Sequence, residues 1–116
     1  MDSYKHIRVE RHGDVFCVRL RHTRLEENEI HQLGSELIDL CEQQGCRKLA
    51  LSLGPQPPDC LYSVFLAKLM TLQRRLAEMG CALLLCEVSP EVQAIFQVCH
   101  FAEYFRFVPD FDAAVV

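Results

Sequence analysis

Apolar residues recur along this chain at two spacings, one typical of strands and one typical of helices. Ile7 and Val9 alternate with charged neighbours, as in a half-buried strand, whereas residues 15–18 are apolar on both faces. Gly13 lies between these segments and is free to take the positive φ of a tight turn. We therefore predict an antiparallel hairpin formed by residues 5–11 and 15–18.

Two longer segments carry apolar residues three and four positions apart, the spacing of an amphipathic helix. The first predicted helix spans residues 27–44, with negative charge at its start, where the helix dipole favours it, and Gly45 at its end. The second follows the proline-rich loop 54–58, runs from residue 63 and ends at Gly80. The apolar stripes consist of Ile30, Leu33, Leu37, Leu40 and Cys41 in the first helix and of Phe65, Leu69, Leu72, Leu76 and Met79 in the second.

Shorter apolar segments between these helices predict strands. Residues 49–53 and 81–86 have the composition of strands that are buried on both faces of a sheet. A Ser-Pro pair at 89–90 predicts the start of a third helix, since serine caps helices and proline suits their first position. Residues 104–108 alternate, as in a strand nearer an edge, and a final helical turn follows them.

The order of the elements defines the fold class. Strands that are separated by helices pair in parallel through right-handed crossovers, and the opening hairpin makes the sheet mixed. A chain of 116 residues can bury one core but not two. We predict a single α/β domain with a mixed β-sheet, an N-terminal β-hairpin and helices packed on the sheet.

Charge and hydropathy narrow the classes of partner. The net charge of −4 argues against general nucleic-acid binding, which needs lysine and arginine to neutralise phosphates. Residues 1–6 lack the apolar core of a signal peptide, and the longest apolar run, 81–86, is too short to cross a bilayer. We expect a cytoplasmic protein that does not insert into a membrane.

The seven cysteines are interpreted as free thiols in a reducing compartment. Cys41 and Cys46 have four residues between them, as do Cys81 and Cys86, whereas a common zinc knuckle has two. Cys81 and Cys86 are predicted to face opposite sides of one strand, so they cannot share an ion. We expect buried cysteines that act as small apolar residues, and no metal or cofactor.

The sequence contains no recognisable catalytic signature. A phosphate loop, a G-x-S-x-G elbow, an H-E-x-x-H helix and a dinucleotide-binding glycine fingerprint are all missing. We therefore do not expect an enzyme. The five histidines are scattered and are interpreted as surface residues; they are His6, His12, His22, His31 and His100.

The segment 59–63 opens the second predicted helix and is interpreted as a recognition surface. The positive end of a helix suits a capping serine, an anion or a phosphorylation switch. One role for Ser63 is that of a cap or first-turn hydroxyl that satisfies a backbone donor and contributes about 1 kcal/mol. The other is that of a phosphate acceptor, which gains a charge of about −1.5 to −2 and repels a docked partner. Cys60 also lies near the helix start, but the neighbouring Asp59 disfavours a reactive thiolate.

Several local patterns resemble the STAS domain, the fold of bacterial anti-sigma-factor antagonists, over almost the whole chain. Residues 49–53 resemble the central strand of that family, and residues 66–76 resemble the helix that follows its phosphorylated serine. Residues 79–92 are similar to its glycine, strand and Ser-Pro helix start. Phe105 and residues 110–114 match its last strand and helix.

The switch motif of that family is Asp-Ser-Ser-Gly-Leu-Gly, whose first serine is phosphorylated by an anti-sigma kinase. When Leu66 is aligned with the leucine of the motif, Ser63 falls on the phosphorylated serine. A second alignment, which starts at Asp59, places Cys60 on the serine but moves the leucines out of register. In the first alignment Tyr62, Val64, Phe65 and Ala67 replace the aspartate, the second serine and the two glycines, and Ser52 replaces an acidic residue of the preceding strand.

The resemblance implies a single STAS-like domain over residues 1–116 that binds an anti-sigma factor or a related kinase. Phosphorylation of Ser63 would switch that binding. The altered motif leaves an alternative, a diverged STAS scaffold that dimerises or accompanies a transporter without a phosphorylation cycle. The predicted partner-binding residues are Asp59, Cys60, Tyr62, Ser63, Val64 and Phe65.

Overall fold

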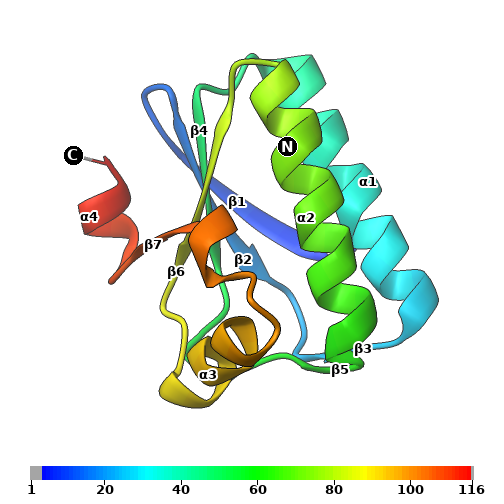
Figure 1. Ribbon diagram of the computed structural model, residues 1–116. Helices are drawn as coiled ribbons and strands as arrows, with labels where there is room; N and C mark the ends of the chain where they lie inside the picture. The colour runs from blue at the N-terminus through cyan, green and yellow to red at the C-terminus, as the bar shows by residue number, and fades with distance from the viewer. Residues whose placement is uncertain (1–3, 116) are drawn as a thin grey trace.

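A mixed sheet of five strands forms the centre of the protein (Figure 1), which a computed structural model describes over residues 4–115. The strand order is β1-β2-β4-β6-β7; β1 and β2 are antiparallel, and the other neighbours are parallel. The predicted α/β class and mixed sheet are therefore confirmed. The strands are β1 (Ile7–His12), β2 (Val15–Leu20), β4 (Lys48–Ser52), β6 (Ala82–Cys86) and β7 (Arg106–Val108).

Helices cover both faces of this sheet (Figure 1). On one face, α1 (Glu27–Gln44), α2 (Tyr62–Glu78) and α3 (Pro90–Val98) bury their apolar residues in a core shared with the strands. On the other face, the short helix α4 (Phe111–Val115) places Ala114 against Ala50, Leu84 and Cys86. Over residues 4–115, none of the helices combines the length and the apolarity that crossing a membrane requires.

Two short elements were not predicted. The strands β3 (Arg24–Leu25) and β5 (Asp59–Cys60) form a separate parallel pair beside the starts of α1 and α2. A strand of two residues is too short to show any periodicity, so the hydrophobic pattern of the sequence cannot reveal it. The last strand also starts later than predicted, because residues 102–104 form a 3₁₀ turn.

The carboxyl ends of the parallel strands and the starts of α1 and α2 lie at the same end of the molecule (Figure 1). Each parallel strand is followed by a connection at its carboxyl end, and ligand and partner sites of α/β proteins are commonly built from such connections. The loop 54–58, β5 and the predicted switch segment all belong to this end.

Candidate partner-binding surface

Helix α2 begins without a capping side chain. Leu61 occupies the N-cap position, and its carbonyl oxygen accepts from the backbone N–H groups of Val64 and Phe65 over 3.1 and 3.0 Å. Ser63 is therefore the second residue of the helix and not its cap, which corrects the capping role considered from the sequence. Its side chain is exposed, and its hydroxyl takes part in no side-chain hydrogen bond found within residues 4–115.

Tyr62 and Phe65 anchor the helix start to the rest of the protein. The Tyr62 hydroxyl donates to the carbonyl oxygen of Pro58 over 2.6 Å, and its ring meets that of Phe65 edge-on with the centroids 6.0 Å apart. Burial raises the pKa of Tyr62 to about 12. Phe65 is only 1% exposed, so the expectation that it contacts a partner is wrong. A large apolar side chain at this position finds more stabilisation in the core than at the surface.

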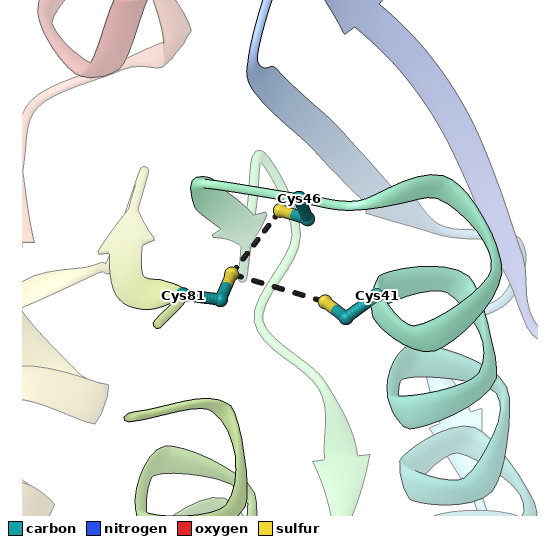
Figure 2. Close-up of side chains that lie close together, drawn as sticks. All are labelled: Cys41, Cys46 and Cys81. Carbon is teal, nitrogen blue, oxygen red and sulfur yellow. Dashed lines mark hydrogen bonds between the residues drawn. The ribbon is translucent and has the colours of Figure 1, made fainter. Parts of the chain in front are cut away.

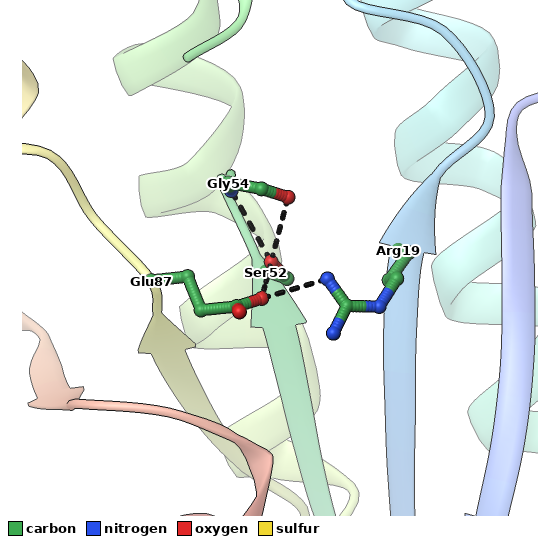
Figure 3. Close-up of polar contacts among 4 residues, drawn as sticks. All are labelled: Arg19, Ser52, Gly54 and Glu87. Carbon is green, nitrogen blue, oxygen red and sulfur yellow. Dashed lines mark hydrogen bonds and ion pairs between the residues drawn. The ribbon is translucent and has the colours of Figure 1, made fainter. Parts of the chain in front are cut away.

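A polar network fixes the loop that leads to the helix (Figure 3). Ser52, at the end of β4, is 1% exposed; its hydroxyl donates to the Glu87 carboxylate over 2.5 Å and accepts from the backbone N–H of Gly54 over 3.2 Å. Arg19 donates to the same carboxylate oxygen over 2.8 Å. The ends of β2, β4 and β6 are thereby joined through Glu87, and the first residue of the loop is bound to them.

Gly54 is required where this loop leaves the sheet. A Cβ atom at this position would lie 2.5 Å from the Glu87 carbonyl oxygen and 2.9 Å from the Glu87 Cβ. Real Cβ atoms do not approach backbone atoms so closely, so any larger residue would push the loop away from β6. A pocket of about 250 Å³ lies beside the loop and is lined by Arg19, Leu20, Thr23 and residues 52–56.

The β3–β5 pair holds the residues just before α2. The backbone N–H of Asp59 donates to the Thr23 carbonyl oxygen over 2.7 Å, and Asp59 and Cys60 are in register with Arg24 and Leu25. Burial, and then the Asp59 charge, raise the pKa of Cys60 to about 11. A thiol with a raised pKa is a poor nucleophile at neutral pH, which agrees with the sequence interpretation that Cys60 is not reactive.

Only Asp59 and Ser63 of the six predicted partner-binding residues are exposed. Residues 55–57 are also exposed. Leu61, which lies in the predicted recognition segment 59–63 but not among the predicted partner-binding residues, is 61% exposed. We call these residues (55–57, Asp59, Leu61 and Ser63) the docking surface. Three neighbouring residues, Cys60, Tyr62 and Val64, are partly buried and pack against the core.

The structure also brings together cysteines that sequence spacing did not associate (Figure 2). Cys41 near the end of α1, Cys46 before β4 and Cys81 before β6 are all buried. The Cys81 sulfur lies 3.1 Å from that of Cys46 and 3.8 Å from that of Cys41. Hydrogen bonds with Cys46 and Cys81, together with burial, raise the pKa of Cys41. This cluster lies at the amino ends of the parallel strands, opposite the docking surface.

Most of the cysteines are buried, as predicted, but one histidine that was predicted to lie at the surface is buried too. Cys17 and Cys86 are buried like the three clustered cysteines, Cys60 is partly buried and Cys99 is exposed. His6 was interpreted as a surface residue but is only 6% exposed. The sequence shows no sign of its burial, because its partners lie in distant segments.

Comparisons with known structures identify the fold. The anti-sigma-factor antagonist (STAS) domain protein of Planctomyces limnophilus has 25% sequence identity to this chain, with 94% of each chain covered and a TM-score of 0.75. Protein TM1081 of Thermotoga maritima has 16% identity, covers 93% of this chain and 90% of its own, and also has a TM-score of 0.75. The Bacillus cell-fate determinant SpoIIAA in its phosphorylated form has 14% identity, covers 93% of this chain and 96% of its own, and has a TM-score of 0.67.

The chain has the STAS fold, and the resemblance stated from its sequence is confirmed. No protein-family model and no curated protein sequence matches it significantly. The structural neighbours named above include anti-sigma-factor antagonists, which are regulators.

Proposed function

We propose that this protein is a non-enzymatic regulatory module that binds an anti-sigma factor or a related kinase through the docking surface. Phosphorylation of Ser63 switches the binding off. The observation that carries the proposal is the position of Ser63: its hydroxyl is exposed in the first turn of α2 and is not used in capping. A phosphate can be added there without breaking a hydrogen bond that the fold needs.

The start of α2 is also compatible with the added charge. A helix start carries backbone N–H groups without intrahelical partners and a positive dipole end, both of which stabilise a phosphate. No acidic residue lies in the first turn of α2. The domain would therefore stay folded after phosphorylation. A partner that covers Leu61 would have to bury the new dianion, which carries a large desolvation penalty.

A second candidate function is a diverged STAS scaffold that dimerises or accompanies a transporter, with no phosphorylation cycle. The observation in its favour is that two positions of the aligned motif serve packing. Tyr62 is bound to Pro58, and Phe65 fills the core where the motif has a glycine. A motif that has taken on structural roles can have lost its switching role.

Affinity capture from native extract with three variants separates the two candidates. Wild type is expected to capture a kinase-fold, ATP-binding protein, and Ser63→Asp is expected to lose it, whereas Ser63→Ala retains it. Thr71→Asp is the matched control, because Thr71 is an exposed hydroxyl residue about two turns further along the same helix.

Incubation of the captured complex with ATP and mass spectrometry of the released protein then locates the phosphate. Phosphate on Ser63 supports the switch. Capture of the same partner by wild type and Ser63→Asp alike would refute the phosphorylation switch and favour the scaffold. Sedimentation equilibrium would then measure whether the scaffold dimerises.

A further inference from the structure

We propose that His6, His22 and Glu29 form a binding site for a divalent transition-metal ion, with zinc as the best match. His6 directly precedes β1, His22 lies in the connection between β2 and β3, and Glu29 is in the first turn of α1. One ring nitrogen of each histidine and one carboxylate oxygen of Glu29 lie within 4.8 Å of one another. Three segments that are distant in sequence thus bring metal-binding atoms to one point.

The hydrogen-bond partners of the two histidines call for a cation between them. The Nε2 atom of His6 lies 2.7 Å from the Gln32 side-chain oxygen, and the Nδ1 atom of His22 lies 3.0 Å from the Arg24 carbonyl oxygen. Both oxygens can only accept, so each ring carries its proton on that nitrogen. The remaining nitrogens, His6 Nδ1 and His22 Nε2, then present lone pairs to each other across 3.2 Å. Such a pair is favourable only when a metal ion or a proton lies between the two nitrogens.

The distances suit zinc. With Zn–N bonds of about 2.0–2.1 Å, two ligands of a tetrahedral ion lie about 3.3 Å apart, and the two facing nitrogens are 3.2 Å apart. Histidine ligands of metals usually donate their other N–H to a carbonyl or carboxylate oxygen, which fixes the ring and increases its basicity. Gln32 and Arg24 supply these two acceptors, so the outer contacts of a metal site are already formed.

Glu29 completes a three-residue ligand set. One of its carboxylate oxygens accepts from the backbone N–H of Glu26 over 2.8 Å, which orients the side chain and leaves the other oxygen available. Glu36 holds the neighbouring chain in place, because its carboxylate accepts from the backbone N–H groups of Lys5 and His6 over 2.8 and 3.0 Å. Two imidazoles and a carboxylate favour zinc and its transition-metal neighbours over magnesium or calcium. Water would occupy the fourth position.

An uncharged arrangement is the rival explanation and makes the opposite predictions. If the Gln32 amide were turned over, its NH₂ group would donate to His6 Nε2, and His6 Nδ1 would donate to His22. No cation would then be needed. Gln32→Glu separates the two cases, because a carboxylate can only accept. The Gln32→Glu substitution is expected to increase the zinc affinity by about tenfold if the site binds metal, because the new carboxylate accepts from His6 Nε2.

The test is a zinc titration of the full chain by isothermal calorimetry. We expect one zinc ion per chain, a loss of affinity of more than about tenfold in His22→Asn and in Glu29→Gln, and an unchanged affinity in His31→Asn. Glu29→Gln keeps an oxygen that can accept from Glu26, and His31 is an exposed histidine of the same helix. Absence of zinc binding by wild type, or equal binding by wild type and His22→Asn, would overturn the proposal.

Cobalt(II) distinguishes this site from the cysteine cluster. Cobalt bound by His6, His22 and Glu29 gives weak visible bands, whereas cobalt bound by Cys41, Cys46 and Cys81 adds intense sulfur-to-metal charge-transfer absorption. Charge-transfer absorption that Cys46→Ala abolishes would also overturn the proposal. If a variant fails to fold, ¹⁵N spectra of wild-type histidines decide: zinc must shift the imidazole resonances of His6 and His22, and unshifted resonances refute the site.

Discussion

Replacing Ser52 with alanine removes the hydroxyl that joins the end of β4 to Glu87 and to Gly54. The bond to the Glu87 carboxylate is 2.5 Å long; Ser52 is 1% exposed and the Glu87 side chain is 27% exposed, so water replaces the lost partner only in part. A hydrogen bond to a charged group contributes about 1.5–3 kcal/mol. Arg19 still pairs with Glu87 in the variant, so the charge keeps one partner. We therefore expect Ser52→Ala to lower the free energy of unfolding by about 2 kcal/mol.

Urea unfolding followed by circular dichroism measures this loss. For a domain of this size the midpoint should fall by roughly 1–2 M, with an unchanged m-value. A double-mutant cycle with Glu87→Gln should give a coupling energy of about 1 kcal/mol or more, because the two side chains are in direct contact. Ser35→Ala is the control, because the exposed Ser35 hydroxyl bonds, among residues 4–115, only to the His31 carbonyl oxygen of its own helix. Its removal should change stability by less than about 0.5 kcal/mol.

A stabilising bond between Ser52 and Glu87 is refuted if Ser52→Ala is as stable as Ser35→Ala, or if the effects of Ser52→Ala and Glu87→Gln simply add. Either result would mean that the loop 54–58 is not held by the network at the strand ends. The position of the docking surface would then depend on the β3–β5 pair and on Tyr62 alone.

Three further predictions concern the same region and the thiols. Gly54→Ala should lose about 1–3 kcal/mol of stability in the same urea assay, because its Cβ would contact the Glu87 backbone; an unchanged midpoint would contradict this clash. Phe65→Ala should lose about 3–5 kcal/mol, and a loss below about 1 kcal/mol would show that the ring is not core. With Ellman's reagent at neutral pH, exposed Cys99 should react fast and Cys60 slowly, because its raised pKa leaves little thiolate. The other five thiols are buried and should react only on unfolding; several fast thiols in the native protein would disprove the burial described here.

The regular elements are predictable from the sequence because the information for each lies in one continuous segment. Helix α1 has its apolar stripe, its acidic start and its terminal glycine within residues 26–45, and its bounds agree with the prediction. The buried strands β4 and β6 are short apolar runs between turn signals, and their order fixes a parallel sheet with helical crossovers. The STAS resemblance rests on the same local patterns, which explains why the fold class was predicted correctly.

The site was predicted less completely, because its features depend on contacts between distant segments. Only the tertiary structure places Leu61 and not Ser63 at the cap of α2 and buries Phe65. It also places the carboxylate of Glu87, the residue after β6, against Ser52, which replaces an acidic residue in the aligned motif. Only the tertiary structure buries His6 beside His22. Periodicity reports which face of an element is apolar, but it does not report which side chains from other elements lie against that face. The sequence by itself therefore determined the helices α1–α4, the strands of the main sheet and their order. Packing decided the β3–β5 pair and the chemistry at the ends of the elements.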